Sequence, residues 1–207
     1  MAMEVCIGTN ILSGRQYDAI ESSLVDRCRR RDMEAFGKLV DAYQNRVFGF
    51  VRRMINNPEE AADVTQDVFV RAFQSFDRFD GRSSLRTWLF RIAYNLCIDR
   101  VRRSDRRVTE VALVEPGEEG ETMEVADMRW QPEQIALDDE LMGVVEEGIL
   151  SMSEKLRSVL LLHDKEEMAY EEIANLLDVP IGTVKSRLFL ARAHLQNVLK
   201  TYLEARA

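Results

Sequence analysis

The stretch YEEIANLLDVPIGTVKSRLFLAR, residues 170–192, decides the fold of the C-terminal part of this chain. Apolar residues recur at helical spacing on both sides of Pro180 and Gly182. Proline cannot donate to a helix, so we expect the segment from Asp178 to Ile181 to break the first helix and Thr183 to cap the second. The pattern predicts a helix-turn-helix in which two apolar faces pack together. These faces comprise Ile173, Ala174 and Leu177 in the first helix and Val184, Leu188, Ala191 and Leu195 in the second.

The second helix of this motif is positively charged. It carries Lys185, Arg187 and Arg192, and no acidic residue lies between Asp178 and Glu204. A positive helix that projects from a small helical unit fits the major groove of DNA. The alternative is a plain helical hairpin with a solvated basic face.

Composition limits the other classes of function. Of the 207 residues, 31% are charged and 46% are apolar, as in ordinary globular proteins. The apolar runs are too short to span a membrane and no signal peptide is legible, so we expect a cytoplasmic protein without membrane insertion. Cys6, Cys28 and Cys97 show no CxxC spacing, and His163 and His194 stand alone. We therefore expect no metal, cofactor, catalytic residue or small-molecule substrate.

Charge is segregated along the chain, whose net charge is −8. Between Val108 and Glu140 the sequence holds 11 acidic residues and one basic residue, a local charge of −10, so the rest of the chain carries +2. Residues 81–107 hold eight arginines against two aspartates, a local charge of +6. The acidic segment also contains glycine and proline without a helical period, which is typical of a linker. A basic region thus precedes an acidic linker.

Helical patterns flank this linker, and no strand pattern competes with them. We predict an all-α fold of two small helical domains at residues 22–107 and 134–204, joined by the linker at 108–133 and preceded by an N-terminal extension at 1–21. The first expected helix covers about residues 24–31, and the second begins after an Asp32 cap and ends at Asn56, Asn57 and Pro58. Further helices are expected at about 59–76, 85–103 and 132–150, with a loop at 77–84. We expect another helix from a Ser153 cap to residue 164.

Two segments carry a resemblance to a known family. They read ADVTQDVFVRAFQSFDRFDGRSSLRTWLFRIAYNLCIDRVRR at residues 62–103 and GTVKSRLFLAR at residues 182–192. In both, the chain resembles bacterial sigma factors of the extracytoplasmic function (ECF) group, in the sigma-70 family. The resemblance implies a region 2-like domain that binds core RNA polymerase and the −10 promoter element, and a region 4-like helix-turn-helix for the −35 element. It also implies an anti-sigma factor as a partner.

The predicted helix at 59–76 has an apolar stripe opposite a polar face. The residues alone favour a solvated face, with an Asp67 to Arg71 pair worth roughly 0.3 to 0.5 kcal/mol. The resemblance instead implies that this face docks on a coiled coil of the polymerase. The candidate core-polymerase-binding residues are Asp63, Gln66, Asp67, Val70, Arg71 and Gln74.

The next loop and helix are the candidate −10 surface. The resemblance implies that Phe79, at the loop tip, captures a base flipped from the non-template strand; alternatively its ring folds back over the loop. We expect Trp88 in the core rather than as a strand-separating wedge. Asp99 either orients Arg102 or Arg103 toward DNA or forms a structural bridge. The candidate −10-binding residues are Phe79, Arg86, Arg91, Tyr94, Asn95, Arg100 and Arg103.

The outward side of the second helix of the helix-turn-helix is the candidate −35 surface. Ser186 and Arg187 can bond base edges, whereas Lys185 and Arg192 lie nearer the rims and reach phosphates. Leu190 departs from the family pattern, which often has a basic or polar residue there. A leucine can contact thymine methyl groups or sugars but cannot bond a phosphate. The candidate −35-binding residues are Thr183, Lys185, Ser186, Arg187, Phe189 and Arg192.

Together these features predict a sigma factor that is not an enzyme. It would bind core polymerase, direct it to promoters in a stress or envelope response, and help to melt the −10 region by binding energy. An alternative is an autonomous helix-turn-helix regulator, and a more distant one is an interaction protein whose DNA surface is idle. The linker is either an inert tether or, by resemblance, a polyanion mimic that threads through the polymerase.

Overall fold

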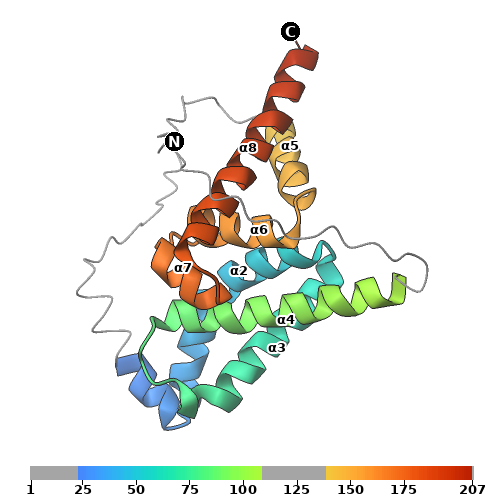
Figure 1. Ribbon diagram of the computed structural model, residues 1–207. Coiled ribbons are helices and arrows are strands. Elements are labelled where there is room, and N and C mark those ends of the chain that lie inside the picture. Colours follow the sequence, from blue (N-terminus) through green and yellow to red (C-terminus); the bar gives the residue numbers. More distant parts are fainter. Residues whose placement is uncertain (1–22, 109–138, 207) are drawn as a thin grey trace, which may run out of the picture.

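The computed structural model describes residues 23–108 and 139–206, which we call the N-terminal and C-terminal modules. Within these ranges the chain forms helices and turns but no strand, which confirms the predicted all-α fold (Figure 1). The predicted linker at 108–133 and the extension at 1–21 lie essentially outside the described residues. The boundaries that we predicted for the domains stay predictions.

The first long helix of the N-terminal module has well-defined ends. Residues 23–29 form a short helix, after which Arg31 takes a φ of 62°. Helix α2, Met33–Ile55, then begins after Asp32, whose side chain accepts hydrogen bonds from the backbone N–H groups of Glu34 and Ala35 at 3.0 and 3.1 Å. This is the predicted N-cap. At the other end, Asn56 takes the left-handed conformation that commonly ends a helix.

Two further helices complete this module. Helix α3, Pro58–Ser75, has the Asn57 side chain as its N-cap and a proline at its first position, where no N–H is needed. A short turn, η1 (Phe76–Arg78), leads toward α4, Leu85–Val108. Helix α4 extends five residues beyond the predicted end at residue 103, because no glycine or proline interrupts the sequence there.

The C-terminal module contains the predicted helix-turn-helix. Helix α5, Asp139–Leu150, is followed by α6, Glu154–Leu160, and by the π-helical turn η2, Leu161–Lys165. Ser153 stands at the N-cap position of α6, but its hydroxyl forms no capping hydrogen bond. The motif itself consists of α7, Tyr170–Leu177, and α8, Ile181–Arg206.

One predicted cap in the motif is wrong. Helix α8 begins before Thr183, because the carbonyl oxygen of Pro180 already accepts hydrogen bonds from the N–H groups of Thr183 and Val184 at 2.9 and 3.2 Å. Thr183 therefore lies inside the helix. The predicted packing is confirmed: Ile173, Ala174, Leu177, Val184, Leu188 and Ala191 are buried, and Leu195 is half-buried.

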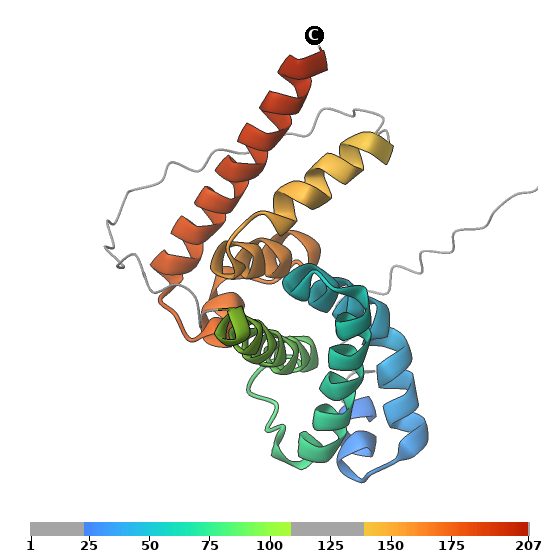
Figure 2. The same ribbon diagram turned by 90° about the vertical axis from the view of Figure 1, so that its right-hand side faces the viewer.

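The two modules lie side by side. Helix α7 packs across the N-terminal half of α4, while α5 and α6 contact α2 (Figures 1 and 2). The C-terminal half of α8 projects away from the N-terminal module (Figure 2). The helix-turn-helix thus meets the module that carries the candidate −10 residues.

Candidate functional site

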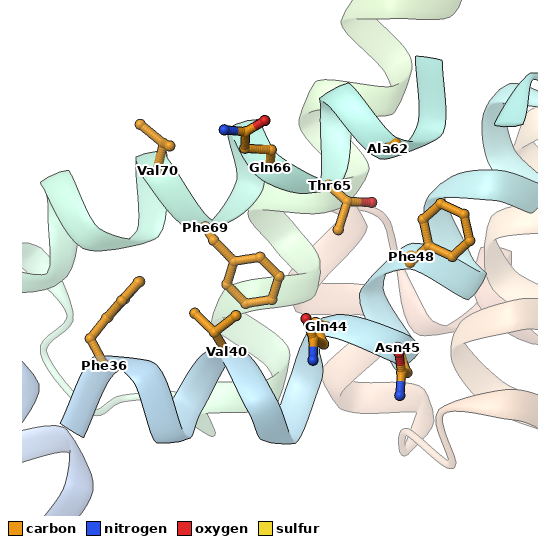
Figure 3. Close-up of a pocket in the computed structure, with 10 residues that line it drawn as sticks. All are labelled: Phe36, Val40, Gln44, Asn45, Phe48, Ala62, Thr65, Gln66, Phe69 and Val70. Atoms are coloured by element: carbon orange, nitrogen blue, oxygen red, sulfur yellow. The ribbon is translucent and has the colours of Figure 1, made fainter. Parts of the chain in front are cut away.

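The candidate polymerase-binding residues all lie on the exposed side of α3. Beside them, α2 and α3 form an open apolar groove of about 480 Å³ (Figure 3). Phe69 lies in the groove and Val70, which is 45% exposed, stands at its edge. Across the groove, α2 contributes Val40 and the partly exposed ring of Phe48. The sequence predicted a polymerase-binding surface on α3 alone. It gave no sign of Phe48, because one outward aromatic does not disturb the helical period of α2.

The other candidate residues on α3 are polar, and two of them, Asp63 and Asp67, lie near Arg100 of α4. Arg100 of α4, a candidate −10 residue, donates a hydrogen bond to Glu60 of α3 at 3.0 Å. This bond raises the pKa of the Arg100 guanidinium, and the charges of Asp63 and Asp67 add to the effect. Arg100 therefore lies beside the acidic edge of α3.

The structure places Phe79 in the core of its loop. Only 5% of the residue is exposed, and its ring packs against Phe76 and Trp88 with centroids 5.9 and 5.2 Å apart. Arg29 donates to the Phe79 carbonyl oxygen at 2.6 Å and lies over its ring. The ring therefore folds back, which was one of the two alternatives left open, because the neighbouring aromatic rings supply a core that the loop sequence did not reveal. Capture of a base by Phe79 would require the ring to leave this cluster.

The first two candidate −10 arginines contact the helix-turn-helix. Arg86 donates to the Glu166 carbonyl oxygen at 2.8 Å and pairs with the Glu172 carboxylate at 3.3 Å. The Thr87 hydroxyl donates to the other oxygen of Glu172 at 3.0 Å. One turn later, Arg91 donates to the carbonyl oxygen of Asn175 at 3.0 Å. Helix α7 therefore covers the part of the −10 surface that carries these arginines.

The remaining candidates on α4 lie farther along the helix. Tyr94 is half-buried, and burial raises the pKa of its phenol, while the nearby positive charges of Arg187 and Arg102 oppose that rise. Arg187 belongs to α8, so this ring marks a second approach of the helix-turn-helix to α4. Asn95 and Arg103 are exposed, as is Asp99.

Buried charge joins the modules on the side of α2. Arg157 of α6 is only 9% exposed, and it donates to the carbonyl oxygens of Arg53 and Met54, at the end of α2, at 2.8 and 3.2 Å. It also donates to Leu150 and Met152 at 2.5 and 2.6 Å. Burial lowers the pKa of this guanidinium. The negative ends of two helices thus surround a buried positive charge.

Two carboxylates of the C-terminal module complete the contact with α2. Glu166, whose side chain is 7% exposed, pairs with Arg46 at 2.6 Å. Glu146 pairs with Arg52 and Arg53 at 3.1 and 3.0 Å. Sequence reasoning missed these contacts, because their partners lie about 90 to 120 positions apart and share no periodicity.

On the candidate −35 surface of α8, the side chains at one rim are charged, whereas those at the centre are mainly apolar. At one rim, Lys185 lies over the Tyr170 ring at 5.7 Å, and Arg192 pairs with Asp164 at 2.6 Å. At the centre, Phe189 is 39% exposed and Leu190 is 53% exposed. The Ser186 hydroxyl donates to the Thr183 carbonyl oxygen at 3.1 Å. The outward centre of the helix is therefore largely apolar.

Other kinds of site find little support in the described ranges. Among residues 23–108 and 139–206, no group of three or more His, Cys, Asp or Glu side chains could hold a metal ion. None of the helices described there is long and apolar enough to cross a membrane. The buried Cys97 has its thiol pKa raised to about 12 by burial, so this thiol is protonated at neutral pH.

Comparison with known proteins identifies both modules. The family profile of Sigma-70 region 2 matches residues 39–107, and that of Sigma-70 region 4 matches residues 143–195. Curated relatives match over nearly their whole length. The RNA polymerase sigma-H factor of Pseudomonas aeruginosa is 34% identical over 88% of this chain and 95% of its own. The ECF RNA polymerase sigma-E factor of Escherichia coli is 36% identical over 84% of this chain and 91% of its own.

Solved structures agree in fold. CnrH, in complex with the cytosolic domain of CnrY, matches with a TM-score of 0.63 and 25% identity over 88% of this chain and 98% of its own. The sigma factor RpoE of Bartonella quintana, in complex with the anti-sigma factor NepR, matches with a TM-score of 0.61 and 26% identity over 80% of this chain and 96% of its own. The presence of both regions in one chain favours a sigma factor over an autonomous regulator. The chain belongs to the ECF group of the sigma-70 family, whose members direct RNA polymerase to promoters.

Proposed function

We propose that this chain binds core RNA polymerase through the outward face of α3 and the adjoining groove. The observation that carries the proposal is the groove itself, an apolar surface beside a row of exposed polar residues on one helix. An apolar centre with a polar rim is the usual composition of a protein interface. The exposed Val70, at the edge of the groove, is the side chain whose burial would contribute most directly.

In the same proposal, α8 binds the −35 element and α4 binds the −10 element. Both helices carry arginine, which suits phosphate contacts. The chain contributes binding and trapping of extruded bases, while nucleotide transfer belongs to the polymerase. It is therefore not an enzyme, and it works in the cytoplasm, where the polymerase acts.

Binding of the −10 element through Arg86 and Arg91 requires the modules to separate. Residues of α7, together with Glu166 ahead of it, bind donors of both side chains in the structure. The Arg86–Glu172 pair is partly exposed, and such pairs contribute only about 0 to 1 kcal/mol each. DNA phosphates can therefore replace these partners once the polymerase holds the N-terminal module.

An anti-sigma factor is the second protein partner that we propose. The support comes from the two solved relatives, whose structures contain CnrY and the anti-sigma factor NepR. The groove between α2 and α3 is a surface that such a protein can cover in competition with the polymerase. The acidic linker, by its charge, is proposed to thread through the polymerase as a polyanion mimic.

Transcription in vitro tests the proposed function. Core polymerase and a pool of promoter fragments should yield defined transcripts only when this protein is added. The Val70→Asp variant should lower core binding by more than about tenfold, because it places a charge in an apolar contact. Thr201→Asp, an exposed change on α8, is the matched control and should bind normally. Unchanged transcripts on addition of the protein would refute the function, and normal binding by Val70→Asp would refute the docking face.

A further inference from the structure

We infer that the recognition helix α8 reads thymine methyl groups in the −35 element through Phe189 and Leu190. This inference rests on the proposed role of α8 in −35 binding and adds the chemistry of what is read. Leu190 is 53% exposed and Phe189 is 39% exposed, on a helix whose inward residues Val184, Leu188 and Ala191 are buried.

The position of the two side chains on α8 is central. At 100° per residue, Phe189 and Leu190 lie on either side of the line that runs through Ser186, opposite the buried face. A helix in the major groove directs this side toward the base edges. Leu190 and Phe189 would therefore lie where the helix is closest to the bases.

Polar readout at this centre is limited by a hydrogen bond that is already made. The Ser186 hydroxyl uses its single hydrogen to donate to the Thr183 carbonyl oxygen. Its oxygen can still accept, but donation to a base would break the internal bond. The centre therefore presents carbon, and the thymine C5-methyl is the apolar group that the major groove offers.

Charge identifies DNA, rather than a protein, as the occupant of this apolar surface. Lys185 and Arg192 lie toward α7 and η2, where Tyr170 and Asp164 contact them. Arg187 lies on the other side, near Tyr94 of α4. Residues 179–203 contain no acidic residue. An apolar centre between positive rims matches a major groove, in which methyl groups lie on the floor and phosphates lie at the edges.

Replacement of thymine by deoxyuridine tests the inference, because it removes only the methyl group. The −35 sequence is first selected from a randomised duplex pool with the holoenzyme made from wild-type protein. Each selected thymine is then replaced singly by deoxyuridine. We expect at least one replacement to weaken promoter binding by about fourfold, which corresponds to ~0.8 kcal/mol for one buried methyl group. Replacing that thymine by 5-methylcytosine, paired with guanine, should retain more affinity than replacing it by cytosine.

Variants at the two positions separate this inference from the function. Leu190→Ala should bind the thymine promoter more weakly and lose most of the difference between thymine and deoxyuridine at one position. Phe189→Ala should do the same at a neighbouring position. Initiation at selected promoters without any effect of deoxyuridine would overturn the inference and leave the proposed function intact. The absence of initiation at every promoter would refute the function itself. A deoxyuridine effect that persists in both alanine variants would also overturn the inference.

Discussion

The two candidate DNA-binding surfaces, on α4 and on α8, differ in what covers them. On α4, the guanidinium groups of Arg86 and Arg91 are bound to Glu172 and to the Asn175 carbonyl oxygen of α7. On α8, the central side chains Phe189 and Leu190 are exposed. The centre of the −35 surface is therefore accessible while the modules are together, whereas this part of the −10 surface becomes accessible only when they separate. The same helix-turn-helix exposes one DNA surface and covers the other.

The largest expected effect comes from removal of the buried charge at Arg157. An Arg157→Met variant leaves the carbonyl oxygens of Arg53, Met54 and Met152 without their donor. Unsatisfied buried groups cost about 1 to 3 kcal/mol each, so we expect a loss of at least about 3 kcal/mol in the free energy of unfolding. Chemical denaturation measures this loss.

Lys200→Met, on the exposed end of α8, removes one positive charge without a buried partner and serves as the control. Its stability should change by less than about 0.5 kcal/mol. Equal effects of the two variants would show that Arg157 does not hold the modules together.

A Glu172→Gln variant should remove part of the cover from the −10 surface alone. The amide keeps an acceptor for the Ala169 N–H but loses the charge that pairs with Arg86. We expect single-stranded −10 DNA to bind several-fold more tightly, while duplex −35 DNA binds as before, because α8 is unchanged. Fluorescence anisotropy measures both affinities.

Glu171→Gln is the matched control, since Glu171 is an exposed carboxylate on the same helix. A change of charge in general would affect both variants equally. Tighter −10 binding by Glu171→Gln as well would therefore argue against a specific cover by Glu172.

The smallest expected effect is a shift in the alkaline titration of Tyr94. Burial raises the pKa of Tyr94, so the folded protein favours the neutral phenol. The contribution of this residue to the free energy of unfolding is fully present below the ordinary tyrosine pKa of about 10 and is lost as the pH rises through the raised value. We expect the difference in phenolate absorbance between wild type and Tyr94→Phe to show a titration above pH 10. A titration that is ordinary in the free protein would contradict the packing of Tyr94.

The sequence was most informative where structure is local. Periodicity predicted the buried faces of α7 and α8, and Asp32 was correctly identified as a cap, since both depend on residues within a few positions. Thr183 was misjudged because the Pro180 carbonyl oxygen had already started the helix.

Tertiary contacts were the other source of error. For Phe79 the sequence could not decide between base capture and a folded-back ring, since no local pattern reports that Phe76 and Trp88 receive its ring. The binding of Arg86 by Glu172 joins residues 86 positions apart and has no signature in either segment. The candidate −10 residues were therefore named without the helix that covers them.

The distance between the modules is the most direct test of whether they lie together in the free protein and separate when the −10 element is bound. Spin labels at Lys38→Cys on α2 and Thr201→Cys on α8, in a background with Cys6, Cys28 and Cys97 replaced, report that distance by pulsed electron paramagnetic resonance. Both labelled positions are exposed and lie outside the candidate surfaces. We predict one narrow distance for the free protein and a clearly longer one when core polymerase and promoter DNA are bound. The same distance in both states would contradict this prediction.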